Sequence, residues 1–282
     1  MSAHESKRKR RPQNHPAEQG FYVYAIAERD ALSQLFADAL PAAIEPEAAL
    51  EMLAQDDLAA VVSPVPLERY GEDALQEQLA DATWTAIRAM RHEKVVEHFA
   101  RRMSIIPLRF GIIYLERERL KEMLSQKQEE LRAIIKRLRG REEWGVNIYY
   151  DRAKLLEKIT ELSPRLRELA ESADSASPGQ SYLLRKKIDG LREAEARAET
   201  KRVAARVEEE LSSRSEGAAR LRVLKDEATE VGELAARLAF LVERERFREF
   251  RAAAEQLAKE YEDAGFKLEL TGPWPAYNFA AN

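Results

Sequence analysis

The side chains best suited to acid–base or metal chemistry are few and lie apart from one another. The chain has four histidines and no cysteine. His92 and His98 are six residues apart in a segment with a helical pattern. That spacing turns their side chains about 240° away from each other, so they cannot bind one metal ion. Without cysteine there is neither a thiolate nucleophile nor a thiolate metal ligand. We therefore predict no metal site.

Sequence signatures of catalysis are also missing. The chain contains no His-Glu-x-x-His helix, no glycine-rich phosphate loop and no Gly-x-Ser-x-Gly elbow. Its many carboxylates alternate with lysine and arginine on helical faces, which is typical of solvated surface. We predict that the protein is not an enzyme and has no catalytic residue and no cofactor. The alternative is an enzyme on a ferredoxin-like fold, which a histidine or carboxylate with a shifted pKa in a deep pocket would favour.

One charged residue stands among apolar neighbours. Arg109 lies within residues 105–114, a stretch that is otherwise apolar. A buried guanidinium needs a carboxylate or carbonyl partner, so we expect Arg109 to be paired inside the fold. The functional alternative is that Arg109 anchors a partner protein or the C-terminal tail.

The end of the chain combines stiffness with aromatic area. Residues 272–282 hold Trp274, Tyr277 and Phe279 together with two prolines. Proline fixes φ and removes a backbone donor, so this tail should be extended, and neither a helix nor a central strand. Each ring would contribute roughly 1.5–3 kcal/mol if buried. We predict that the tail packs in a groove at the junction of the two halves and fixes their orientation. The competing hypothesis is a free tail that binds a partner.

The first half of the chain predicts an α+β domain over residues 20–139. Aromatic and β-branched residues indicate strands at 21–27 and 57–64, and alternation indicates another at 108–114. Helices are predicted at 30–39, 84–103 and 116–139, the last with a stripe of leucine and isoleucine. The side chains expected in the core are Leu108, Phe110 and Ile112 of the third strand and Ile87, Met90, Val95, Phe99 and Met103 of the second helix.

The second half, residues 140–271, predicts a βαββαβ order. Strands are expected at 146–150, 220–225, 234–243 and 266–271, with a long charged helix at 180–211 and another helix at 245–264. This is the order of a ferredoxin-like sandwich. The long helix has a narrow apolar seam, which suits a coiled-coil partner, either the preceding helix or another molecule. The seam is Leu184, Ile188, Leu191, Ala194, Ala198, Val203, Val207 and Leu211. We thus predict an α+β fold with two domains, the C-terminal one ferredoxin-like with a helical insertion and long, partly coiled-coil helices.

Composition narrows the class of protein further. Charged residues make up 34% of the 282, above the ~25% of an average domain, which indicates long exposed helices. No apolar run approaches the ~20 residues that span a bilayer, and no apolar stretch follows the basic N-terminus as in a secretory signal. Residues 1–19 carry a run of five basic residues at 7–11. We interpret them as a disordered basic tail, and expect a cytoplasmic protein with no nucleic acid or membrane partner.

Five short motifs, in order, resemble the GvpF/GvpL family of gas vesicle proteins. The motifs are FYVYAI at 21–26, LAAVVS at 58–63, PLRFG at 107–111 preceded by His92, AFLV at 239–242 and GPWPAYNF at 272–279. The similarity spans roughly residues 20–280. Ala276 departs from it, because the family usually has a further proline at that point.

The resemblance implies a gas vesicle accessory or minor structural protein. Such a protein would bind the small hydrophobic shell subunit and other gas vesicle accessory proteins, limit subunit aggregation and assist vesicle nucleation and assembly. It would act in the cytoplasm, at the gas vesicle. Candidate residues for partner binding or tail docking are Arg109, Trp274, Tyr277 and Phe279. The alternative is a general coiled-coil scaffold or interaction protein unrelated to gas vesicles.

Overall fold

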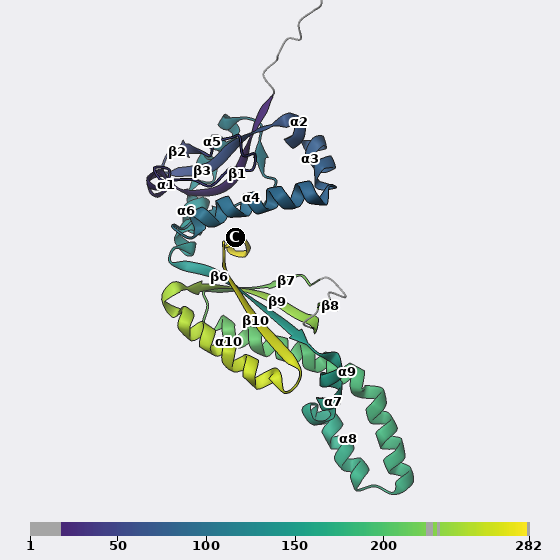
Figure 1. The fold of residues 1–282 in the computed structure, drawn as a ribbon. Coiled ribbons are helices and arrows are strands. Elements are labelled where there is room, and N and C mark those ends of the chain that lie inside the picture. Colours follow the sequence, from purple (N-terminus) through teal and green to yellow (C-terminus); the bar gives the residue numbers. More distant parts are fainter. Residues whose placement is uncertain (1–17, 224–227, 230–231, 281–282) are drawn as a thin grey trace, which may run out of the picture.

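A computed structural model describes residues 18–223, 228–229 and 232–280 and shows a mixed α+β fold with two antiparallel sheets (Figure 1). The strands of the first half are β1 (Gln19–Glu28), β2 (Glu51–Gln55), β3 (Leu58–Pro66), β4 (Ile106–Pro107) and β5 (Ile113–Tyr114). Its helices are α1 (Arg29–Leu35), α2 (Leu67–Tyr70), α3 (Glu72–Leu79), α4 (Ala82–Ala100), α5 (Arg117–Gln126) and α6 (Gln128–Leu138). The basic tail predicted at residues 1–19 lies, up to residue 17, outside the described residues.

The second half follows the predicted βαββαβ order with one additional short strand between the two central strands. Its strands are β6 (Arg141–Tyr150), β7 (Gly217–Leu221), β8 (Ala228–Thr229), β9 (Gly232–Glu243) and β10 (Phe266–Trp274). Its helices are α7 (Arg152–Leu162), α8 (Pro164–Asp174), α9 (Pro178–Ser212) and α10 (Phe247–Glu262), with the short 3-10 helices η1 (Arg244–Arg246) and η2 (Tyr277–Phe279). The strand predicted at 220–225 begins earlier, as β7, and residues 224–225 lie outside the described part. Among the described helices, even α9 lacks the sustained hydropathy of a bilayer-spanning segment.

β1 is the central strand of the first sheet, whose order is β2-β3-β1-β4, with β5 also paired to β1. Both of its faces are covered, which explains its unbroken apolar run. Tyr22 and Tyr24 face a cluster with α4, whereas Val23 faces the cluster formed with α5 and α6. The strands predicted at 21–27 and 57–64 are confirmed as β1 and β3.

The two sheets share one apolar cluster. The second sheet has the order β10-β6-β9-β7 and carries α7, α9 and α10 on one face. On its other face, Ala239 and Leu241 of β9 join Leu131, Ile135 and Leu138 of α6. Figure 1 shows the C-terminal end of the chain between the two sheets. The junction between the halves is therefore a packed apolar layer that includes the tail.

The strand predicted at 108–114 is not continuous. The chain pairs with β1 at β4 and again at β5, and it turns between them at Gly111, whose φ is +90°. Leu108 and Phe110 are consequently half-buried and pack at the margin of the two apolar clusters, and Ile112 is exposed. The prediction that these three side chains form core is therefore wrong for Ile112 and met only in part for the other two. Alternation along a strand places side chains on one face only while the backbone stays extended.

The predicted helices are found close to their expected positions, but some of the side chains expected to face the core are exposed. In α4, Ile87 and Met90 are 43% and 61% exposed, while His92, Val95 and Phe99 are buried. The helix predicted at 116–139 is two helices that meet at Lys127, although its apolar stripe is buried as predicted. In α9, which packs against α7 and α8 of the same chain, the predicted seam is buried at Val203, Val207 and Leu211 but differs in its middle. Ala194 and Ala198 are exposed, and Ala196 and Glu199 are buried in their place.

Candidate partner-binding site

The tail leaves the second sheet and returns to the first half of the chain. β10 continues to Trp274, which pairs with Glu143 of β6, so the segment begins as part of an edge strand. After the buried Pro275 the chain bends into η2, which corrects the prediction that no part of the tail is helical. η2 brings Tyr277 against α4, where its hydroxyl donates to Glu93 Oε2 at 3.0 Å.

Phe279 closes the junction from the other side. Its ring is only 8% exposed and packs beside Gly217 of β7 and Leu241 of β9. A Cβ added to Gly217 would lie 3.1 Å from the ring, so this position favours glycine. The carbonyl oxygen of Phe279 accepts a hydrogen bond from Arg137 of α6. One residue of the tail thus contacts both halves.

Asn278 fixes the tail to the second sheet through a buried carboxylate. Its backbone N–H and its side-chain amide donate to the two oxygens of Glu143 at 2.9 and 2.5 Å. Glu143 is 4% exposed, and this burial raises the pKa of its carboxyl group, while the two bonds from Asn278 act in the opposite direction. Buried carboxylates need such donors, so the tail and β6 stabilise each other.

His92 organises the loop that follows α4. Its Nε2 lies 3.1 Å from the carbonyl oxygen of Leu108, to which it must donate, since that oxygen only accepts. Its Nδ1 then accepts from the Tyr22 hydroxyl at 2.9 Å. The Tyr22 oxygen in turn accepts the backbone N–H of Gly111 at 3.0 Å. Burial lowers the pKa of His92 to about 4, and the bond to Leu108 opposes that effect, so the ring is neutral at pH 7.

Arg109 occupies the exposed tip of this loop. It lies between Leu108 and Gly111, the two positions that His92 and Tyr22 hold. The expectation that Arg109 is buried and paired is wrong, because the turn at Gly111 directs residue 109 to solvent. Within the described residues, no carboxylate lies at ion-pair distance from its guanidinium. The loop is therefore held from inside by His92 and Tyr22, and it exposes the side chain of Arg109 to solvent.

We expect Arg109→Met to leave the stability unchanged, because an exposed unpaired side chain contributes within about 0.5 kcal/mol. Arg88→Met is the matched control. Arg88 lies 2.9 Å from Glu45, and both side chains are nearly buried, at 11% and 8% exposed. Losing one partner of such a pair costs roughly 3–5 kcal/mol. Urea denaturation of both variants measures the change in the free energy of unfolding. Equal losses of stability would contradict this placement of Arg109.

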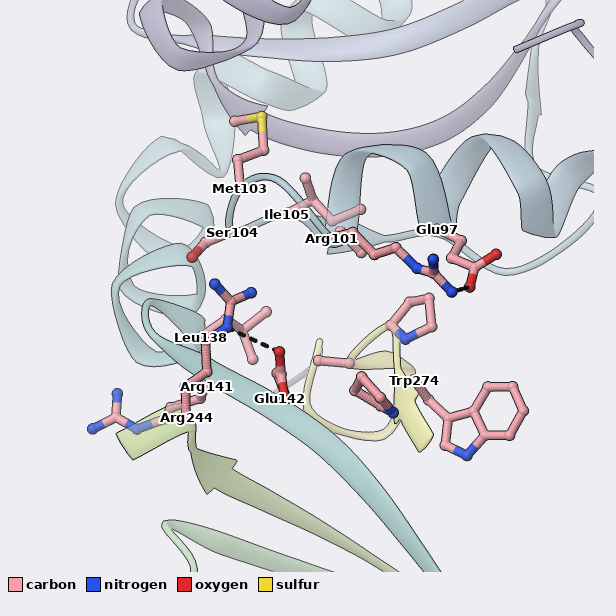
Figure 2. A pocket seen from close by; sticks show the side chains of 14 residues that line it. Glu97, Arg101, Met103, Ser104, Ile105, Leu138, Arg141, Glu142, Arg244 and Trp274 are labelled. Carbon is pink, nitrogen blue, oxygen red and sulfur yellow. Dashed lines mark hydrogen bonds and ion pairs between the residues drawn. The ribbon is translucent and has the colours of Figure 1, made fainter. Parts of the chain in front are cut away.

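A small cleft of about 50 Å³ opens between the tail and the first half (Figure 2). Its apolar lining includes Met103, Ile105 and Leu138 together with the tail prolines. Its charged rim is largely neutralised, because Glu97 pairs with Arg101 and Glu142 pairs with Arg244 at 3.0 Å.

Trp274 lies at the edge of this cleft and points away from the body (Figure 2). Its indole N–H donates to Thr271 Oγ1 at 3.2 Å, yet the residue is 51% exposed. This differs from the expectation that all three tail rings are buried. The arrangement divides the tail: Tyr277 and Phe279 face inward at the junction, and Trp274 stays available on the surface.

Sequence reasoning missed the polar groups that hold this region together. Glu143 meets Asn278 across 135 residues of sequence, a contact that no local pattern indicates. For Tyr22 and His92 the sequence did offer an indication. Both belong to the motifs that precede Pro107–Gly111, one on a predicted strand and one on a predicted helix. In the part of the chain that the structure describes, no group of three or more acidic or histidine side chains is arranged to bind a metal ion.

Comparisons with known proteins place this architecture among gas vesicle proteins. The family model described as gas vesicle synthesis protein GvpL/GvpF matches residues 20–281, and the chain belongs to this family. Two relatives from a Streptomyces species, gas vesicle proteins L and F, are each 28% identical to it. The alignment with protein L covers 81% of this chain and 82% of the relative, and the alignment with protein F covers 92% and 98%.

Solved structures show the same fold. The crystal structure of the gas vesicle protein GvpF from Anabaena superposes with a TM-score of 0.65 at 18% identity, covering 94% of this chain and 99% of that one. GvpF from Microcystis aeruginosa superposes with a TM-score of 0.58 at 18% identity, covering 93% and 99%. The resemblance drawn from the five sequence motifs is confirmed.

Proposed function

We propose that this protein assists gas vesicle assembly by binding the hydrophobic shell subunit at the cleft of Figure 2. Bound there, the subunit is kept from aggregating and is available for vesicle nucleation. The observation that carries the proposal is Trp274, a half-exposed indole ring beside an apolar cleft. Tryptophans in such positions are frequent energetic centres of protein interfaces. Membership of a gas vesicle family supports the choice of partner.

The exposed face of α4 extends this surface. Met90 lies seven residues before Glu97, close to two helical turns, and therefore on the same face of α4. Met90 and Ile87 are 61% and 43% exposed. Together with Trp274 they would give a flexible, apolar contact area for an apolar client. Arg109 is a second proposed contact, for an acidic group of the shell subunit or of another gas vesicle accessory protein.

The fold gives this surface a rigid support. We infer two domains, residues 20–139 and 140–271, joined by the tail at 272–282, in which Tyr277 and Phe279 dock the two together. The strand order β10-β6-β9-β7 in a βαββαβ chain supports a ferredoxin-like second domain. In this proposal α8 and α9 form a helical insertion with partly coiled-coil packing. The proposed role is non-enzymatic, needs no cofactor and is exercised in the cytoplasm, at the gas vesicle.

We expect Trp274→Ala to weaken binding of the shell subunit at least ~tenfold, as for an interface residue of central importance. The matched control is Tyr182→Ala, which removes another exposed aromatic ring, 66% exposed, from α9. Binding is measured by pull-down and by suppression of light scattering from aggregating subunit, in chelator and without nucleotide.

Two results would argue against the proposal. Equal binding by the Trp274 and Tyr182 variants would remove the cleft from the interface. Loss of binding on adding chelator would show that the interaction needs a metal ion. Thermal melting of each variant controls for folding.

A further inference from the structure

β10 leaves one edge of the second sheet open. Within the described residues β10 pairs only with β6, and it ends the strand order of its sheet (Figure 1). An open edge presents backbone N–H and C=O groups that another strand can pair with. The direction of those groups follows from Asp151, whose N–H donates to the carbonyl oxygen of Gly265 at 2.8 Å.

Hydrogen-bonding direction alternates along an antiparallel strand. Since Gly265 faces β6, the backbone groups of Lys267, Glu269 and Thr271 also face β6. The backbone groups of Phe266, Leu268 and Leu270 therefore face the open edge. The register with β6 is unbroken from Phe266 to Thr271, so this alternation holds along the whole stretch.

The side chains of β10 are self-complementary in charge. Lys267 and Glu269 are both exposed and lie on the face of the sheet opposite to α10. Among the described residues no carboxylate lies at ion-pair distance from Lys267. Glu269 accepts from Asn147 and Tyr149 through Oε2 alone, which leaves Oε1 for a further donor.

We propose that β10 pairs with β10 of a second copy of this chain, antiparallel about a two-fold axis at Leu268. In this register Leu268 lies opposite its own copy, and Phe266 lies opposite Leu270, so the outward backbone groups form about six hydrogen bonds. Lys267 of each copy lies opposite Glu269 of the other. An axis at residue 267 or 269 would instead place lysine against lysine or glutamate against glutamate.

The apolar side of the strand favours the same partner. Leu268 and Leu270 are only half-buried and line a groove of about 420 Å³ between β10 and α10. Ala254 and Ala258 of α10 form part of its wall. In the two-fold arrangement, each Leu270 gains the facing Phe266 as a cross-strand neighbour on this side. The two sheets then become one, and both open β10 edges disappear.

Sedimentation of the full chain over a concentration series tests the pairing. We expect a concentration-dependent dimer. Lys267→Glu and Glu269→Lys should each weaken it at least ~tenfold, because each places like charges opposite one another twice. An equimolar mixture of the two variants restores opposite charges at both positions, and it should form a heterodimer about as tightly as the unmodified chain dimerises. Hydrogen exchange supplies a second readout, since the amides of Leu268 and Leu270 should be protected only in the dimer.

Three outcomes overturn the proposal. A chain that stays monomeric throughout the series excludes self-pairing. This conclusion also holds if another protein pairs with the β10 edge. A dimer that neither variant weakens places the contact elsewhere. Variants that both stay monomeric when mixed, while their melting shows them folded, exclude the register at Leu268.

Discussion

Phe279→Ala is expected to lower the free energy of unfolding by ~3–5 kcal/mol, the range for truncating a buried phenylalanine. The ring is 8% exposed and contacts β7, β9 and the cluster that α6 forms with both sheets. Its loss therefore opens a cavity at the junction between the two halves. Because the two halves share this cluster, we also expect proteolysis between them to accelerate.

Trp274→Ala is the control, since it removes a larger ring from the same tail. The ring of Trp274 is half exposed, so its loss should cost less than ~1 kcal/mol. Urea denaturation at pH 7 gives both values. Equal effects of the two substitutions would show that the tail does not divide into an inward part and a surface part. A negligible effect of Phe279→Ala would show that the tail is not docked in solution.

The second large effect concerns pH. The pKa of His92 is lowered from 6.5 to about 4 by burial, so the folded protein holds this ring neutral where the unfolded chain protonates it. The contribution of His92 to stability is complete above pH 6.5 and is lost as the pH falls toward 4. By linkage the loss amounts to ~3 kcal/mol. Urea denaturation from pH 7 to pH 4 measures it.

The variant His92→Gln isolates this contribution. The half-buried Glu93 and the buried Glu143 have raised carboxyl pKa values, so they add stability as the pH falls and partly mask the loss. They are present in both proteins, and the difference between the two pH profiles therefore reports His92. A His92 ring that titrates near pH 6.5 in the folded protein by NMR would refute the buried neutral state. Parallel pH profiles would lead to the same conclusion.

The regular elements were predictable because each carries its own periodic signal. The apolar side chains of α10 recur at spacings of three and four, and Phe250, Ala254, Leu257 and Tyr261 are all buried as that pattern predicts. β1 is rich in aromatic and β-branched residues, and β3 carries three valines. In such elements the local pattern and the tertiary packing agree, so sequence alone suffices.

The failures arise where tertiary contacts override the local pattern. Residues 108–114 alternate like a strand, but Gly111 adopts a left-handed conformation and the loop binds Tyr22 and His92 instead. In α4 the apolar Met90 stays exposed, while the polar His92 is buried because two hydrogen bonds satisfy its ring. Neither partner is close in sequence. The sequence therefore sufficed to propose a candidate site on the tail. It did not indicate that Tyr277 and Phe279 face inward while Trp274 stays on the surface.

The fluorescence of Trp274 tests the central claim most directly. In a variant with Trp84→Phe and Trp144→Phe, Trp274 is the remaining tryptophan of the chain. We expect a solvent-like emission that soluble quenchers reach in the isolated protein. Addition of shell subunit should shift the emission to shorter wavelength and protect it from quenching.

Emission that is already blue-shifted and protected in the isolated protein would show that Trp274 is buried against the body. Emission that stays solvent-like while the subunit binds would place the interface elsewhere. Either result would contradict the proposed partner-binding site.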